Sequence, residues 1–171
     1  MPIRRILVLG GARSGKSAFA ERLAVECGEP VVYVATATAL DAEMEERIAH
    51  HRARRPQAWQ TLEATMGLAE CLSVETVRAT TFLIEDLTFL LSNHMERDSA
   101  GAEARTLEEV DALLTREASV ILVSNEVGMG LVPPYPLGRL FRDALGRVNQ
   151  AAAGLCSEVY LTVAGLPLRL K

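Results

Sequence analysis

Gly10–Gly11–Ala12–Arg13–Ser14–Gly15–Lys16–Ser17 is the stretch of sequence that decides the fold. It has the form glycine, four residues, then Gly-Lys-Ser, which is the pattern of a phosphate-binding P-loop. An apolar run at 6–9 precedes it and predicts a buried parallel strand. A segment of good helix formers at 18–24 follows it. Strand, glycine loop and helix in this order are the context that the pattern requires.

The residue types of this loop suit a nucleoside polyphosphate. Glycine lets the backbone approach a ligand closely, and loop amides and a helix N-terminus attract phosphate. Lys16 is expected to reach the β- and γ-phosphates as a catalytic residue, and the Ser17 hydroxyl is expected to bind Mg²⁺. We therefore predict that the nucleotide contacts Gly10, Gly11, Ala12, Arg13, Ser14, Gly15, Lys16 and Ser17.

Length and composition indicate one globular domain over residues 1–171. The formal net charge of −4 disfavours a nucleic-acid-binding protein, for which a basic surface is expected. No apolar run has the length of a membrane span, and the first strand begins too early to leave room for a signal peptide. The three cysteines are far apart and predict neither a disulfide framework nor a zinc site. These features predict a cytoplasmic protein.

Apolar runs alternate with helical segments, which predicts an α/β fold with a mainly parallel sheet flanked by helices. After 6–9, the runs lie at 31–36, 80–86 and 118–124. Helices are expected at 41–55, 66–78, 87–95, 106–117 and 137–154, and a C-terminal hairpin at 158–170. With a P-loop after its first strand, the chain is predicted to be a P-loop NTPase-like (RecA-like) domain.

Polar residues follow two of these strands at their carboxyl ends, where ligands bind in open α/β sheets. The segment Ala35–Thr36–Ala37 ends the second run, and Thr36 is a candidate nucleotide contact or a plain turn residue. Glu85 and Asp86 end the third run, where P-loop enzymes place an acid that binds Mg²⁺ or its water. Strand alternation directs these two carboxylates to opposite faces, so we expect only one of them to do this. A solvated acid at a strand end is the alternative.

Two adjacent histidines lie in the predicted 41–55 helix, which ends before Pro56. A rotation of about 100° per residue places His51 nearer to the apolar side of the helix and turns His50 away from it. The charges of this helix are also explained by i,i+4 pairs on a solvated surface. Nearby arginines suit phosphate, however, and a neutral imidazole is a competent nucleophile toward phosphorus.

Later helices carry two further predictions. His94 is expected at the surface or near the C-terminal dipole of its helix. Thr106 and Glu109 have the spacing of a capping box, which places the start of the following helix at Thr106. The segment Asn125–Gly130 combines polar side chains with glycine at the end of the fourth strand, and it is expected to border the site.

Five segments together resemble one enzyme family, the bifunctional adenosylcobinamide kinase/adenosylcobinamide-phosphate guanylyltransferases. The similarity covers nearly the whole chain in the same order and spacing. The segments are the P-loop, Asp41–x–Glu43–Met44–x–x–Arg47–Ile48–x–His50, Arg55–Pro56–x–x–Trp59–x–Thr61–x–Glu63, Ser124–Asn125–Glu126–Val127–Gly128–Met129–Gly130–x–Val132–Pro133 and Phe141–Arg142–Asp143–x–x–Gly146–x–x–Asn149–Gln150.

The resemblance implies two reactions in cobalamin biosynthesis. ATP or GTP phosphorylates the aminopropanol hydroxyl of adenosylcobinamide. GTP then guanylylates a histidine that corresponds to His50, and GMP passes from it to adenosylcobinamide phosphate. The resemblance also implies Mg²⁺ as cofactor, bound by Ser17 and Glu85, and a homo-oligomer, a trimer with sites near subunit interfaces. Beyond the P-loop, it implies nucleotide contacts from Ala35, Thr36, Ala37, Arg52, Ala53, Arg54, Arg55, Glu63 and Glu85.

One residue departs from the family pattern, because Asp86 stands where the family commonly has cysteine before Leu87–Thr88. A second carboxylate beside Glu85 can alter metal binding or titration. Two other functions are compatible with a P-loop. A plain small-molecule kinase would need the P-loop but not His50. A non-enzymatic GTP switch is disfavoured, since the sequence lacks an Asn-Lys-x-Asp motif and an Asp-x-x-Gly after the third strand.

Overall fold

The structure is a computed structural model that describes residues 2–38, 46, 49, 52, 53, 55–72 and 79–171. Most of the predicted 41–55 helix therefore lies outside the described residues. The elements in chain order are β1 (Arg5–Gly10), α1 (Lys16–Cys27), β2 (Val31–Ala35), β3 (Gln60–Glu63), α3 (Leu68–Cys71), β4 (Thr81–Glu85), α4 (Leu87–Arg97), α5 (Ala102–Leu114), β5 (Ser119–Asn125), α6 (Pro136–Leu155), β6 (Glu158–Val163) and β7 (Leu166–Arg169).

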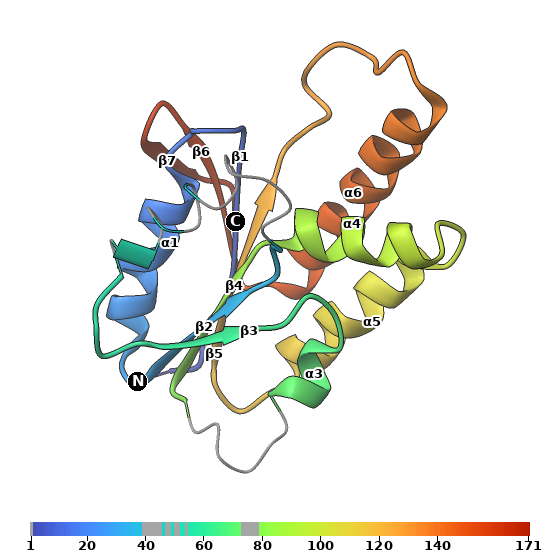
Figure 1. Ribbon diagram of the computed structural model, residues 1–171. Coiled ribbons are helices and arrows are strands. Elements are labelled where there is room, and N and C mark those ends of the chain that lie inside the picture. The colour runs from blue at the N-terminus through green and yellow to red at the C-terminus, as the bar shows by residue number, and fades with distance from the viewer. Residues whose placement is uncertain (1, 39–45, 47–48, 50–51, 54, 73–78) are drawn as a thin grey trace.

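The described strands form one seven-stranded sheet in the order β3-β2-β4-β5-β1-β6-β7. Neighbouring strands are parallel except β6 and β7, which pair antiparallel. This topology confirms the predicted mainly parallel sheet and the C-terminal hairpin. β1, which leads into the P-loop, lies in the interior of the sheet between β5 and β6 (Figure 1). β5 separates it from β4, the strand that ends in Glu85.

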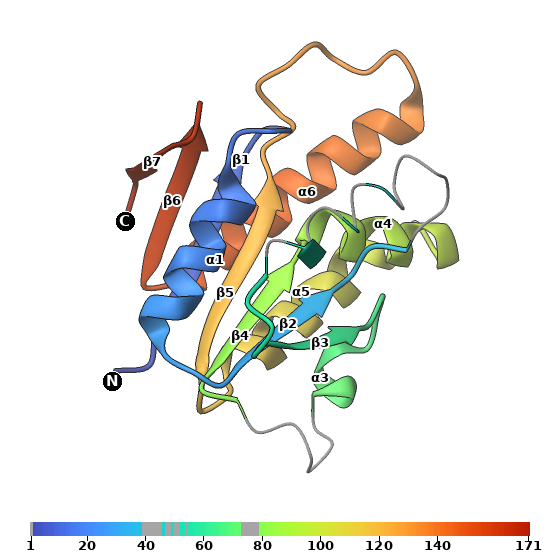
Figure 2. The ribbon, with the colours of Figure 1, turned by 60° about the vertical axis from the view of Figure 1, so that its left-hand side comes forward.

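Helices cover both faces of the sheet, α1 on one and α4, α5 and α6 on the other (Figures 1 and 2). The alternation of side chains along β1 divides the core accordingly. Ile6 and Val8 pack with Leu23 of α1, whereas Leu7 and Leu9 belong to the core on the other face. Both sets are buried, which explains why the sequence of β1 is a continuous apolar run. None of the described helices combines the length and apolarity needed to cross a membrane.

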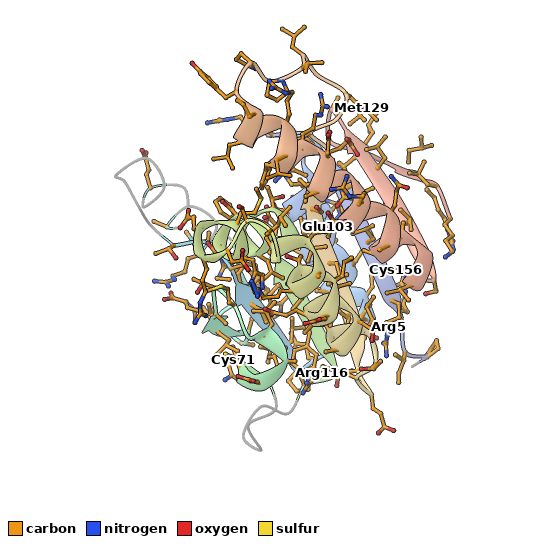
Figure 3. The ribbon with its side chains drawn as sticks, turned by 90° about the vertical axis from the view of Figure 1, so that its right-hand side faces the viewer. Arg5, Cys71, Glu103, Arg116, Met129 and Cys156 are labelled. Atoms are coloured by element: carbon orange, nitrogen blue, oxygen red, sulfur yellow. The ribbon has the colours of Figure 1, made fainter. Side chains whose placement is uncertain are left out.

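The amino edge of the sheet is closed by Arg5 of β1. Its guanidinium donates hydrogen bonds to the carbonyl oxygens of Leu114, the last residue of α5, and of Arg116 and Ala118, which lie between α5 and β5. The bond to Leu114 occupies a carbonyl group that a helix terminus leaves without an intrahelical partner. Arg5 and Arg116 lie together at this edge, and Met129 lies at the opposite end of the molecule, in the loop that follows the carboxyl end of β5 (Figure 3).

The β6–β7 turn packs against the P-loop. Its two central residues, Ala164 and Gly165, have φ values of 52° and 80°, as a tight hairpin turn with the native strand twist requires. The amide of Gly165 donates to the carbonyl oxygen of Ser14 at 2.8 Å. A Cβ on Gly15 would lie 3.0 Å from the Gly165 Cα. The two turns are therefore in backbone contact, and each depends on glycine.

The capping-box prediction for Thr106 is wrong. α5 begins four residues earlier, at Ala102, and the Thr106 hydroxyl donates back to the Ala102 carbonyl oxygen at 2.8 Å within the helix. Thr106 is fully buried, so it packs in the core instead of starting the helix.

His94 is buried, so the predicted surface position is wrong, whereas the alternative is confirmed because His94 lies in the last turn of α4. Its Nε2 lies 2.8 Å from Oε1 of Glu109 in α5. The same carboxylate accepts hydrogen bonds from the amides of Gly67 at 3.0 Å and Leu68 at 2.7 Å, where α3 begins. Glu109 thus joins α3, α4 and α5. The partners of Glu109 lie far from it in sequence, so the local spacing of Thr106 and Glu109 could not predict them and was mistaken for a capping box.

Candidate active site

The P-loop leaves β1 and leads directly into α1, as its sequence pattern predicts. Gly15 is the N-cap of α1 with φ of 92°. Glycine provides no side chain to cap the helix, so the first amides of α1 are left for an anionic ligand. Gly10 is buried and closely surrounded, since a Cβ there would lie 2.7 Å from the carbonyl oxygen of Thr162. Gly11, Ala12 and Arg13 are exposed, so the middle of the loop is open to a ligand.

Lys16 and Ser17 lie at the first turn of α1, next to this loop. The Lys16 side chain is 5% exposed, and its Nζ lies 3.4 Å from the Gly11 carbonyl oxygen, so its stem is packed and its amino group lies over the loop. The Ser17 hydroxyl donates to Oε1 of Glu85 at the end of β4. The helix that follows the first predicted strand and the end of the third predicted strand therefore meet at the carboxyl edge of the sheet.

Glu85 and Asp86 diverge as strand alternation predicts. The Glu85 carboxylate contacts Ser17, whereas Asp86 caps α4 by accepting from the Phe89 amide at 2.9 Å. Burial raises the pKa of Glu85, while the hydrogen bond from Ser17 and the charge of Lys16 act in the opposite direction. Burial also raises the pKa of Asp86, to about 6. The structure thus gives Asp86 a structural role in α4, close to the site.

Thr36 directly follows β2, and its hydroxyl forms hydrogen bonds with the backbone of Asp86. Its side chain is fully buried, its hydroxyl donates to the Asp86 carbonyl oxygen at 2.8 Å, and it accepts from the Asp86 amide at 2.7 Å. The hydroxyl therefore holds the end of β4 in place instead of facing solvent. Ala35 and Ala37, on either side, are half-buried.

The predicted contacts beyond the P-loop are partly described. Arg52 and Ala53 are helical and exposed, and Arg52 forms an ion pair with Glu63 at 2.6 Å. The guanidinium of Arg55 stacks over the ring of Tyr33, with its carbon 3.3 Å from the ring centroid. Arg52 and Glu63 therefore lie at the end of β3, and Arg55 lies beside the paired residues Tyr33 of β2 and Thr61 of β3. The predicted residues His50 and Arg54 lie outside the described residues.

Two asparagines shape the carboxyl edge, and the sequence singled out only one of them. Asn93 of α4 donates to the carbonyl oxygens of Thr36 and Thr65, each at 2.9 Å, and so joins the segments that follow β2 and β3. Asn125 donates to Thr88 at 2.8 Å and to Asp86 at 3.3 Å. Asn125 was expected near the site from its strand-end position. Asn93 lies in an amphipathic helix, and no local sequence signal identifies it.

Ser17 and Glu85 are suitable ligands for Mg²⁺. Both offer oxygen atoms, which Mg²⁺ prefers, and they already lie within hydrogen-bonding distance of each other. Among the described residues no cluster of three or more His, Cys, Asp or Glu side chains could hold a metal. A nucleotide-bound Mg²⁺ typically uses one or two protein ligands together with phosphate oxygens and water.

A family model described as cobinamide kinase/cobinamide phosphate guanyltransferase matches residues 6–170. The chain belongs to this family. As a member of the cobinamide kinase/guanyltransferase family, it is a kinase and a nucleotidyltransferase of cobalamin biosynthesis. The match runs from β1 to the residue after β7, so the whole sheet is part of the family fold.

Two relatives from this family align with nearly their full length. The bifunctional adenosylcobalamin biosynthesis protein CobP of Pseudomonas aeruginosa is 48% identical over 171 residues, which cover 98% of this chain and 97% of CobP. CobU of Escherichia coli, which is also described as a bifunctional adenosylcobalamin biosynthesis protein, is 40% identical over an alignment of 180 residues, gaps included. The alignment covers 97% of this chain and 99% of CobU. A solved structure from Pyrococcus horikoshii OT3 shares the fold, with a TM-score of 0.59 at 8% identity, over 98% of this chain and 86% of that one.

Proposed function

We propose that the protein phosphorylates the aminopropanol hydroxyl of adenosylcobinamide and then transfers GMP to the phosphate through a guanylylated His50. Membership of the cobinamide kinase/guanyltransferase family supports the two activities. The proposal that a nucleotide binds here rests on one observation. Lys16, Ser17 and Glu85 lie together beside the N-terminus of α1, which has no side-chain cap. A phosphate loop, a cation and an oxygen-rich metal site are the parts that phosphoryl transfer requires.

In the kinase step the P-loop amides and Lys16 hold the β- and γ-phosphates of ATP or GTP. The oxygen of the substrate hydroxyl attacks the γ-phosphorus and its proton passes to solvent. The bond between the γ-phosphorus and the β–γ bridging oxygen breaks, and the nucleoside diphosphate leaves. Ser17 and Glu85 would hold Mg²⁺, which supplies positive charge to the phosphate oxygens. Lys16 is held close to the loop by its packed stem, so little reorganisation is needed when charge develops in the transition state.

In the guanylyl step the neutral imidazole of His50 attacks the α-phosphorus of GTP. A nitrogen–phosphorus bond forms, the bond from the α-phosphorus to the α–β bridging oxygen breaks, and pyrophosphate leaves. A phosphate oxygen of adenosylcobinamide phosphate then displaces His50, which gives adenosylcobinamide-GDP. The covalent intermediate divides one displacement into two and predicts ping-pong kinetics. His50 lies outside the described residues, and the proposal for it rests on the family resemblance and on its predicted direction away from the apolar side of its helix.

Arginine side chains that follow His50 in sequence support a phosphate site in this segment. Arg55 is held by Tyr33 and by a 3.3 Å hydrogen bond from its Nη1 to Thr61. Its buried Nε has no hydrogen-bond partner among the residues that the structure describes. A buried guanidinium donor without a protein acceptor suits an anionic ligand, because an unpaired buried donor is costly.

Radiolabelled GTP tests the covalent step directly. The protein is incubated with Mg²⁺ and with GTP labelled at either the α- or the γ-phosphate, without cobinamide, and is then denatured. We expect only the α-label to remain on the protein, to be released by acid, and to be absent from His50→Ala. His51→Ala is the matched control and should retain the label. If neither label remains on the wild-type protein, the reaction has no guanylyl-histidine, and a kinase without a covalent intermediate becomes the better explanation.

A further inference from the structure

An exposed apolar surface lies between the end of β5 and the second turn of α6. Six of the fourteen large apolar side chains that are exposed among the described residues lie between residues 129 and 140. Single exposed apolar side chains are common, but a concentration of them in one segment marks a binding surface. We call this set the apolar patch, and it consists of Met129, Leu131, Val132, Tyr135, Leu137 and Leu140.

The first turns of α6 continue an apolar stripe beyond the core. Ala144 and Val148 lie four residues apart on the buried side of α6. Leu140 and Leu137 lie four and seven residues before Ala144, so helical spacing places them on the same side, yet both are exposed. The segment between β5 and α6 arcs beyond the carboxyl edge of the sheet (Figures 1 and 2). The patch therefore extends the apolar side of α6 into solvent.

The loop that carries the patch is held by contacts with α6. The guanidinium of Arg139 donates to the carbonyl oxygens of Pro133 at 3.0 Å and Pro134 at 2.8 Å. A Cβ on Gly138 would lie 2.9 Å from the Pro133 Cβ, so the loop packs closely against the first turn of the helix. Leu131 is nevertheless 97% exposed. An ordered backbone that displays apolar side chains lowers the entropic cost of binding a ligand.

The patch is continuous with the P-loop. Asn125 pairs with Gly10 in the register of β5 and β1, and the amide of Glu126 donates to the Gly10 carbonyl oxygen at 3.1 Å. Asn149 of α6 donates to the Asn125 carbonyl oxygen at 3.0 Å, which joins the helix to the same strand end. The loop thus leaves the sheet at the first residue of the phosphate site, and a ligand on the patch lies beside that site.

We propose that the apolar patch binds the corrin ring of adenosylcobinamide. The proposal rests on the proposed function, in which the aminopropanol hydroxyl attacks a γ-phosphate held by the P-loop. This hydroxyl belongs to a side chain of the corrin macrocycle, so the macrocycle must rest on a surface next to the P-loop. A corrin ring has broad hydrocarbon faces that carry methyl groups, and exposed leucine, methionine and valine side chains supply apolar contacts for such faces.

The test measures the binding of dicyanocobinamide, a coloured and stable cobinamide, by equilibrium dialysis. Saturating GDP and Mg²⁺ are present, which leaves the γ-phosphate position empty and allows no turnover. Replacement of a contacting leucine by serine removes most of its apolar contact. We therefore expect Leu131→Ser and Leu140→Ser each to raise the Kd for dicyanocobinamide about tenfold. GDP affinity should stay within about twofold of wild type, because the nucleotide contacts the P-loop.

Leu155 provides a matched control within the same helix. It is 50% exposed, against 44% for Leu140, so serine at either position changes a similar surface side chain. Leu155 is the last residue of α6 and lies about 22 Å further along the helix than Leu140. Leu155→Ser should bind dicyanocobinamide like the wild type. Sedimentation velocity at the protein concentration of the dialysis should give the same sedimentation coefficient for the wild type and all three variants.

Three results would overturn the inference. The first is wild-type affinity for dicyanocobinamide in both Leu131→Ser and Leu140→Ser. The second is an equal rise of the Kd in Leu155→Ser, which would indicate nonspecific adsorption. The third is a lower sedimentation coefficient in Leu131→Ser or Leu140→Ser, which would assign the patch to contacts between copies of this chain.

Failure of the inference and failure of the proposed function are distinguishable. If the wild-type protein and the patch variants bind dicyanocobinamide equally, the proposed function stands and only the location of the ring is wrong. If the wild-type protein does not bind dicyanocobinamide, the proposed substrate is wrong and the inference fails with it. The labelling of His50 by GTP is measured without cobinamide, so its outcome is independent of both.

Discussion

Replacement of Gly10 by alanine should destabilise the protein, although both residues are small. An added Cβ would lie 2.4 Å from Ser14 Oγ and 2.7 Å from the carbonyl oxygen of Thr162, both far below ordinary van der Waals contact. The serine side chain can rotate away, but the Thr162 oxygen belongs to the backbone of β6, which pairs with β1 at this position. The strands must separate locally, and overpacking of this kind costs about 1–3 kcal/mol.

Gly11→Ala is the matched control, because a Cβ at Gly11 would have no atom of the described residues within 4 Å apart from its own chain neighbours. Its effect on the free energy of unfolding should be within about 0.5 kcal/mol. Urea unfolding followed by circular dichroism, without nucleotide, measures both variants. With an m-value of about 2 kcal/mol/M, Gly10→Ala should lower the midpoint by about 0.5–1.5 M. Equal midpoints for Gly10→Ala and the wild type, or an equal loss in Gly11→Ala, would refute the reasoning.

Three further predictions concern charged groups. The two hydrogen bonds from Arg4 hold the pKa of Glu158 down at about 2, so this carboxylate stabilises the fold above about pH 4.5 and loses that effect as the pH falls toward 2. Glu158→Gln should therefore lower the free energy of unfolding by about 2–3 kcal/mol at pH 7 and by much less at pH 2.5, and urea unfolding at the two pH values measures the difference. Glu109→Ala leaves two backbone amides and buried His94 without their acceptor, which should cost about 2–4 kcal/mol in thermal unfolding; an unchanged melting temperature would contradict this role. Lys16→Ala should reduce kcat of the kinase step by about 10²-fold or more in a coupled assay, while the circular dichroism spectrum of the protein stays unchanged. A variant with an increased KM and an unchanged kcat would assign Lys16 to binding alone.

The parts of the site that could be predicted from the sequence are those fixed by local pattern. The P-loop is contiguous, so its glycine spacing and flanking elements determine strand, loop and helix together. The contact between Ser17 and Glu85 follows from one general rule, that parallel strands direct their carboxyl ends to the same edge. The opposite directions of Glu85 and Asp86 follow from strand alternation.

The parts that the sequence did not predict depend on partners that are distant along the chain. His94 is polar and lies near a helix end, and only its contact with Glu109 explains its burial. Thr106 has the sequence pattern of an N-cap, but α5 extends one turn further toward the N-terminus and begins at Ala102. Tyr33 belongs to an apolar, β-branched run, which indicates burial but not the stacking of the Arg55 guanidinium over its ring. Tertiary contacts of this kind override local propensity.

The contact between Gly165 and Ser14 has a consequence for the order of biosynthesis. A ribosome makes β1 and the P-loop first, yet β1 acquires its neighbours β5 and β6 only after most of the chain has been translated. The carbonyl oxygen of Ser14 gains its hydrogen-bond donor only after the β6–β7 turn, which contains Gly165, has been translated. A nascent chain stalled before Gly165 therefore lacks the backbone hydrogen bond that joins the hairpin turn to the P-loop.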